Sequence, residues 1–165
     1  MNKEQQIKEW FKKNKTLIYM QSLVRIFDVE EMSISELYQK LGRSINIYYN
    51  GKHKCCIQAH TLYIICLIRL VLDKYFSKSF NDVLFTLEDT LIKKNSDYGS
   101  SFDKSVNKFG WIYVAIELDK KKNRLHSLLK NKEKPNYESI EDTLLDIAGY
   151  CVLSLIYLEN KEIKK

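Results

Sequence analysis

Three carboxylates recur at one spacing in the apolar stretch at residues 137–159. They are Glu138, Asp142 and Asp146, and steps of four residues align them along one face of a helix. Like charges at this spacing destabilise a helix by roughly 0.2–0.5 kcal/mol per pair. A hard divalent cation between the carboxylates is the simplest compensation. Two alternatives stay open, namely a solvated stripe and acids that cap the helix N-terminus.

Asp146 is the acid that is hardest to explain as a surface residue. It stands between Leu145 and Ile147, two turns into a helix that is apolar over much of its surface. Its position therefore favours a role in a site. Tyr150 follows one turn later, and it either supports a carboxylate by hydrogen bonding or packs as a core aromatic.

The cysteines do not form a recognisable metal motif. They lack paired CxxC spacing, and although His53 and His60 lie near two of them, the pattern matches no common zinc finger. We expect reduced and mostly buried thiols. The four cysteines are Cys55, Cys56, Cys66 and Cys151.

Composition indicates an all-α protein. The 165 residues suit one domain, or one domain with a small appendage. One proline and five glycines are few for a loop-rich or all-β chain, whereas long segments rich in Leu, Ile, Lys and Glu favour helices. The apolar run 62–72 is too short for a membrane span and contains Arg69. The polar N-terminus does not resemble a secretory signal, so we expect a cytoplasmic protein without membrane contact.

The apolar periodicity predicts a series of helices separated by short polar segments. Ser33 and Glu36 form a capping box at the start of one of them, and Gly42 is expected to end it. A polar break is expected at 93–102 and a loop at 131–136. The expected helices span residues 2–27, 34–41, 53–76, 83–94, 110–129 and 137–159.

Positive charge is concentrated in the first half of the chain. The net charge is +6, and the whole excess lies within residues 1–78. Residues 30–55 also weakly resemble a repressor-type helix-turn-helix, with Leu41-Gly42 before a serine and a later Gly51-Lys52 turn. We therefore expect residues 1–78 to form an accessory helical region, with DNA binding as one alternative and a solubilising surface as another.

Three blocks in the second half, taken in order, resemble a known family. The chain resembles the nucleotide modification associated domain 1 family of bacteria and phages, which in turn is similar to the MazG-like all-α nucleoside triphosphate pyrophosphohydrolases. The resemblance covers about residues 80–159. The blocks are Lys94-Asn-Ser-Asp97-Tyr98-Gly99-Ser100, then Glu117-Leu-Asp119-Lys120 through Asn123-Arg124-Leu125, then Glu138-Ser-Ile-Glu-Asp142 through Asp146-Ile-Ala-Gly-Tyr150.

This resemblance implies a MazG-like helical bundle with an N-terminal helical extension. Residues 79–165 would form the nucleotide-binding domain. The implied activity is Mg²⁺-dependent release of pyrophosphate from a nucleoside triphosphate, in particular a deoxynucleotide. The resemblance also implies a homo-oligomer, either a dimer or a tetramer.

The resemblance also assigns roles to particular residues. Asp142 and Asp146, with Glu138 nearby, would be the catalytic acids, and these three together with Glu88 would bind the metal. Independently of the resemblance, Lys120, Lys121 and Arg124 follow at helical spacing and are expected to reach phosphate oxygens, with a solvated face as the alternative. Asp97, Tyr98 and Gly99 would contact the base or ribose, with Gly99 allowing close approach of the backbone. The alternative for this trio is an ordinary helix end.

The sequence departs from the MazG pattern at two places. The glutamate expected three residues before the final aspartate is Thr143, and the expected Glu-x-x-Glu pair is reduced to the adjacent Glu88 and Asp89. Adjacent residues on a helix point about 100° apart. These departures weaken catalysis more than binding, so that a non-catalytic protein that binds or sequesters a nucleotide is the second hypothesis.

Overall fold

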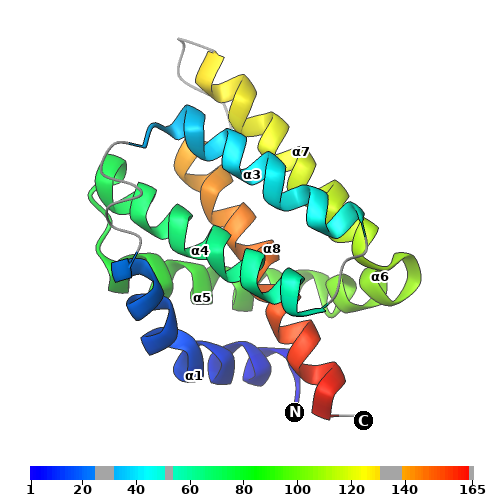
Figure 1. The fold of residues 1–165 in the computed structure, drawn as a ribbon. Helices are drawn as coiled ribbons and strands as arrows, with labels where there is room; N and C mark the ends of the chain where they lie inside the picture. The colour runs from blue at the N-terminus through cyan, green and yellow to red at the C-terminus, as the bar shows by residue number, and fades with distance from the viewer. Residues whose placement is uncertain (25–31, 51–53, 131–138, 164–165) are drawn as a thin grey trace.

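The described residues of the chain, 1–24, 32–50, 54–130 and 139–163, form seven α-helices and no strand in this computed structural model (Figure 1). The all-α prediction is thereby confirmed for the part of the chain that is described. The helices are α1 (Lys3–Val24), α3 (Ile34–Tyr49), α4 (Lys54–Phe76), α5 (Phe80–Tyr98), α6 (Ser101–Phe109), α7 (Trp111–Lys130) and α8 (Ile140–Ile163).

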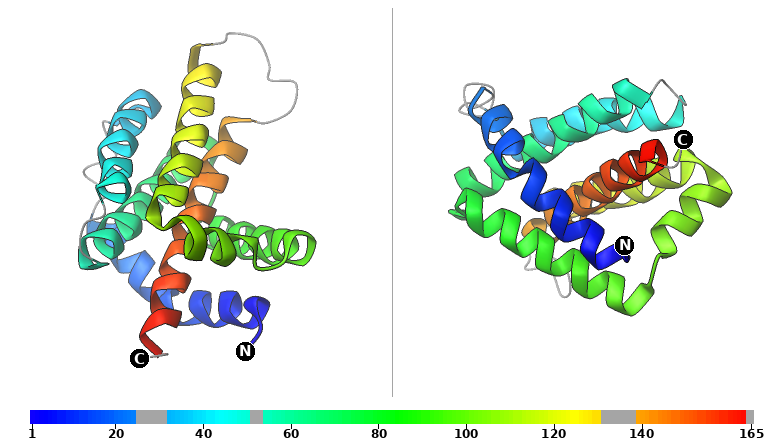
Figure 2. Two further views of the ribbon diagram at one scale, coloured as in Figure 1. Left: turned by 90° about the vertical axis from the view of Figure 1, so that its right-hand side faces the viewer. Right: turned by 90° about the horizontal axis from the view of Figure 1, so that it is seen from below.

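Helix α8 is the centre of the bundle. It contacts α1, α4, α5 and α7, and Figures 1 and 2 show it running through the middle of the molecule. Its sequence explains this position, because apolar and small residues follow one another around most of the helix. Leu144, Ile147 and Val152 are among its side chains with at most 1% exposure. Burial on several sides makes any charge on α8 a costly exception.

Two further pairings complete the bundle. Helix α3 packs along α7 and α4, and α1 packs across α4 and α5. The buried core is continuous from Ile7 in α1 to Leu158 in α8. Residues before and after position 78 therefore share one core, while the functional division at this position stays a prediction.

The sequence located most of the helices but placed the end of α3 wrongly. The capping box of Ser33 and Glu36 is confirmed. The expected stop at Gly42 is wrong, because α3 continues to Tyr49. Gly42 lies against α7, where an added Cβ would be 3.1 Å from Cε of Lys122. Its small size therefore serves helix packing.

The continuation of α3 through Gly42 also removes the turn that the proposed helix-turn-helix would need at this residue. The chain runs as one helix through Gly42, and α3 is packed against α4 and α7. The later glycine of the proposed motif, Gly51, lies outside the described residues. DNA binding through residues 30–55 stays a prediction, without a turn at Gly42 to support it.

The polar break predicted at 93–102 is much shorter than expected. Helix α5 continues to Tyr98, and α6 begins at Ser101. Lys94 and Asn95 therefore belong to a helix. Helix α6 itself was not predicted.

Helix α4 is long and apolar enough to cross a membrane by length and composition alone. In the structure 61% of its most apolar window is buried against other helices. This is typical of the core helix of a soluble protein. Arg69 is itself buried within α4 and lies over the ring of Phe80, 5.3 Å from its centroid.

Candidate functional site

A pocket of about 420 Å³ opens where four helices and one turn meet. The last turn of α5, the turn at 99–100 and the start of α6 form one side, and α7 and α8 form the other. Lys3 of α1 also reaches it. Its polar lining side chains include Lys94, Asn95, Lys121, Asp146 and Tyr150. Several predicted residues thus come together here with residues that were not predicted.

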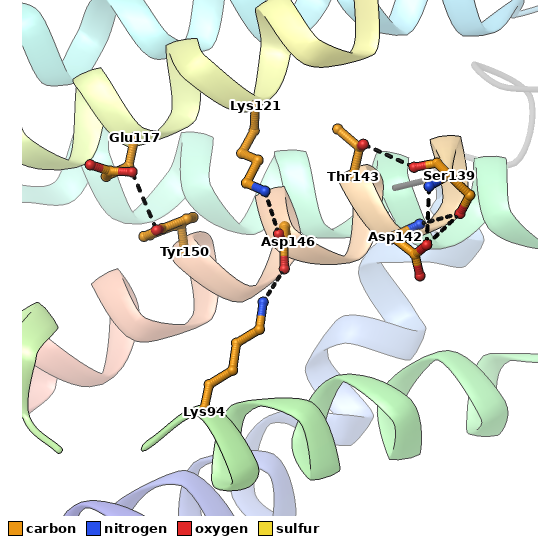
Figure 3. A network of polar contacts seen from close by, with 8 residues as sticks. All are labelled: Lys94, Glu117, Lys121, Ser139, Asp142, Thr143, Asp146 and Tyr150. Atoms are coloured by element: carbon orange, nitrogen blue, oxygen red, sulfur yellow. Dashed lines mark hydrogen bonds and ion pairs between the residues drawn. The ribbon is translucent and has the colours of Figure 1, made fainter. Parts of the chain in front are cut away.

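The carboxylate of Asp146 lies between two lysines (Figure 3). Lys121 of α7 contacts Oδ2 at 2.6 Å, and Lys94 of α5 donates to Oδ1. The Asp146 side chain is 18% exposed, whereas the Lys94 side chain is 50% exposed. One acid on α8 therefore links α5 and α7 through charge-assisted hydrogen bonds.

The electrostatic surroundings keep Asp146 ionised. Burial by itself raises the pKa of this carboxyl group. The hydrogen bonds and charges of Lys121 and Lys94 outweigh burial and hold the pKa below its usual range. Two ammonium groups consequently surround the one carboxylate of Asp146, so that positive charge is in excess at this part of the pocket.

Gly149 explains how α5 and α8 come close enough for this arrangement. A Cβ at this position would lie 3.3 Å from Cδ2 of Leu91 and 3.8 Å from Cδ1 of Leu87. Both leucines lie on the buried face of α5. The small residue therefore allows the two helices to approach beside the pocket. Lys94, one turn after Leu91, is then brought within reach of Asp146.

Helix α5 ends at Asp97-Tyr98-Gly99, as the alternative for this trio expected, and not at the predicted residue 94. Gly99 has φ 59° and ψ −150°, a conformation that is essentially restricted to glycine. Its N–H donates to the carbonyl of Asn95 at 2.8 Å. Tyr98 lines the pocket with a side chain that is 71% exposed. Tyr98 is therefore a rim residue and does not pack in the core.

Aromatic side chains form another wall of the pocket. The ring of Phe102 lies 6.0 Å from that of Tyr113 and 6.4 Å from that of Tyr150, measured between centroids. The Tyr150 hydroxyl donates to Glu117 at 3.4 Å (Figure 3). Burial, followed by the charge of Glu117, raises the pKa of Tyr150 well above its usual value. Tyr150 thus supports a carboxylate, as one of its two predicted roles required, but this carboxylate is Glu117.

Asp142 has a local structural role. Its carboxylate accepts from the N–H of Ser139 at 3.1 Å and from the Ser139 hydroxyl at 2.7 Å. Its own N–H donates to that hydroxyl at 3.0 Å. This is a capping box at the start of α8 (Figure 3). Of the alternatives raised for the acidic stripe, capping describes Asp142.

Other predicted residues also lie away from the pocket lining. Asp97 is exposed, and Glu88 lines a different hollow, between α1 and α5. Lys120 contacts Glu117 at 2.9 Å. Arg124 is partly buried on α7, outside the lining. Glu138 lies outside the described residues, so its predicted role stays a prediction.

Two lysines of the pocket were missed by the sequence analysis. Lys94 opens the first block of the family resemblance, and its place three residues before Asp97 was the available signal. Lys3 had no signal, because its contact with the pocket depends on how α1 packs. Lys121, which was predicted, is the member of the 120–122 run that faces Asp146.

The donor set does not fit a Mg²⁺ site as it stands. Mg²⁺ prefers oxygen ligands in octahedral geometry, whereas both oxygens of Asp146 contact lysine ammonium groups. Among the described residues, no group of three or more His, Cys, Asp or Glu side chains is placed to hold a metal. The arrangement suits an anion better than a cation. Magnesium dependence stays a prediction.

Comparisons with known proteins bear on the segment that builds this pocket. The search of curated proteins and the search of solved structures found no match for the chain. A family model does match, over residues 94–158, which is less than half of the chain. The matched segment begins at Lys94 and includes Lys121, Asp146 and Tyr150. The segment that carries most of the pocket's polar groups is therefore matched by the family described as nucleotide modification associated domain 1.

Proposed function

We propose that the pocket binds a nucleotide and holds its phosphate with Lys94 and Lys121. The observation that carries this proposal is the convergence of these two lysines, from different helices, on Asp146 inside a pocket. The Asp146 carboxylate positions the ammonium groups before a ligand arrives. Arrangement in advance reduces the conformational entropy lost on binding.

The charge and the backbone of the pocket both suit a phosphate. Two lysines and one aspartate leave positive charge in excess, and lysine is a common point-charge partner of phosphate. Helix α6 begins at the pocket lining with Ser101, and its N-cap residue, Ser100, makes no side-chain capping hydrogen bond. The first N–H groups of a helix favour an anion. The start of α6 therefore adds to the positive electrostatic potential that the two lysines produce.

The remaining walls suit a base and a sugar. Phe102, Tyr113 and Tyr150 provide aromatic surface, and apolar side chains of α5 and α8 continue it. Tyr98 stands exposed at the rim, where it can stack on a base. Ligand pockets commonly combine such an apolar surface with a few convergent polar groups.

Hydrolysis of a nucleoside triphosphate with release of pyrophosphate is the second candidate function. The position of Asp146 within the pocket favours it, since this is the acid that the sequence singled out. The capping role of Asp142 and the place of Glu88 on the α1 side leave Asp146 without two of its expected partners. Binding is therefore the function that the geometry supports better.

A thermal-shift screen with and without Mg²⁺ tests the proposal. The panel contains ribo- and deoxynucleoside mono-, di- and triphosphates, and each hit is then assayed for released pyrophosphate. We expect at least one nucleotide to raise the melting temperature in EDTA. The variants Lys94→Gln and Lys121→Gln should each reduce the shift.

The chain supplies a matched control for each variant. Lys93 and Lys120 are direct neighbours of the pocket lysines, but they pair with Asp89 and Glu117 outside the pocket. Lys93→Gln and Lys120→Gln should therefore leave the nucleotide shift unchanged. Equal losses in variants and controls, or no shift with any nucleotide, would refute nucleotide binding here. Release of pyrophosphate that Asp146→Asn abolishes would establish the second candidate.

A further inference from the structure

Lys3 is a buried lysine of α1 that lines the same pocket. Its side chain is 5% exposed, and its Nζ lies 2.7 Å and 2.9 Å from the two oxygens of Asp103 in α6. It lies outside the segment matched by the family model. The pocket thus has a third cation that is supplied by the N-terminal helix.

The start of α1 is built so that Lys3 is held in place. The N–H of Gln5 donates to Oδ1 of Asn2 at 2.8 Å, and the N–H of Asn2 donates to Oε1 of Gln5 at 3.1 Å. This reciprocal pair fixes the first turn of α1. Asn160 of α8 donates to Gln6 at 2.8 Å and ties this turn to the bundle. Lys3 therefore enters the pocket from a fixed backbone.

A stabilising role alone is a weak reason for this lysine to be buried. Removing an ammonium group from water is costly, and an ion pair of similar volume is often no more stabilising than apolar residues in the same place. The Asp103 side chain is 26% exposed and remains in partial contact with water. The ammonium group has three donors, so contact with Asp103 leaves capacity for a ligand in the pocket.

We propose that Lys3 binds the ligand directly and makes the pocket selective for nucleotides that carry more than one phosphate. Lys94 and Lys121 are paired through Asp146, whereas Lys3 is paired separately through Asp103. Lys94 and Lys121 together bind a single phosphate. A second or third phosphate gains a contact with Lys3. This inference rests on the proposed function, which places the first phosphate at Lys94 and Lys121.

Two substitutions in the same ion pair separate ligand binding from structural support. Lys3→Gln removes the cation, whereas Asp103→Asn removes its competitor and leaves the cation in place. If Lys3 binds phosphate, Lys3→Gln lowers the affinity for a nucleoside triphosphate by roughly tenfold and affects the monophosphate less. Asp103→Asn raises the affinity for the triphosphate, because it removes the carboxylate that competes with the ligand for Lys3, and an unchanged affinity counts against this contact. If the pair only supports the fold, both substitutions weaken binding alike.

The measurement is calorimetric titration with nucleoside mono- and triphosphates and with inorganic phosphate and tripolyphosphate. Lys8→Gln is the matched control, because Lys8 lies on α1 and pairs with the exposed Glu4 at 2.6 Å outside the pocket. Lys3→Arg keeps the charge and should restore the preference for the longer phosphate chain. The variant Asp103→Asn still decides the question if Lys3→Gln does not fold.

The outcomes distinguish this inference from the proposed function. Binding of tripolyphosphate that depends on Lys3, without binding of any nucleotide, would support the role of Lys3 and refute nucleotide binding. Nucleotide binding that Lys3→Gln leaves unchanged would refute only the role of Lys3. Parallel losses in Lys3→Gln and Asp103→Asn, or no binding of tripolyphosphate by the unchanged protein, would also overturn it.

Discussion

Replacing Asp146 by asparagine removes the charge that holds two lysines together across three helices. The contact with Lys121 is largely buried, with side chains that are 24% and 18% exposed. A hydrogen bond to a charged group contributes about 1.5–3 kcal/mol, and we take the lower end because water still reaches both partners. The contact with Lys94 is half-exposed and contributes less than about 1 kcal/mol. Asp146→Asn should therefore lower the free energy of unfolding by about 2 kcal/mol.

The pH dependence of this loss gives a second check. Ion pairs hold the pKa of Asp146 below its usual value in the folded protein. A depressed carboxyl pKa stabilises the fold above the unfolded value, and the contribution is lost as the pH falls through the folded value. The difference in the free energy of unfolding between the unchanged protein and Asp146→Asn should thus be largest at pH 7. It should decrease as the pH falls below about 4.

Urea unfolding of both proteins between pH 7 and the lowest pH at which both remain folded measures this difference. Lys120→Gln, which removes an exposed pair on α7, is the control and should change stability by less than about 0.5 kcal/mol. A difference in the free energy of unfolding below about 0.5 kcal/mol at pH 7 would mean that these ion pairs contribute no more to stability than exposed surface pairs do. A difference that does not decrease in acid would show that charge is not its cause.

Three further outcomes follow from the geometry. Gly99→Ala should destabilise the protein by roughly 1–3 kcal/mol, because the backbone conformation there excludes other residues, and urea unfolding would show it. Ser139→Ala should cost about 1 kcal/mol by breaking the capping box with Asp142; an unchanged unfolding midpoint would contradict that role. Burial raises the pKa of the Cys151 thiol, so a thiol reagent should modify the exposed Cys55 and spare Cys151 until the protein unfolds, as peptide mapping would reveal.

Helix positions were predictable because the apolar periodicity is strong in most segments. The end expected at Gly42 was wrong because a glycine can serve either to stop a helix or to let another helix approach. The sequence cannot distinguish these roles without knowing that Lys122 of α7 lies against it. The tendency of glycine to end a helix was therefore overruled by packing against a segment that lies 80 residues later in the sequence.

The candidate site was predictable only in part for a related reason. Spacing singled out Asp146 as an acid within an apolar helix and Lys121 as a phosphate contact, and the resemblance added Tyr98. Spacing also placed Asp142 on the same stripe, but in the structure its carboxylate accepts a hydrogen bond from the hydroxyl of Ser139, three residues earlier. Lys3 came from a remote helix that no local pattern connects with the pocket.

The most direct measurement is calorimetric titration of a nucleoside triphosphate into the protein in EDTA, with Lys121→Gln and Lys120→Gln in parallel. The account predicts saturable binding without a metal, weakened roughly tenfold by Lys121→Gln and unchanged by Lys120→Gln. No binding in EDTA, binding that arises only when Mg²⁺ is added, or equal effects of the two neighbouring lysines would contradict it.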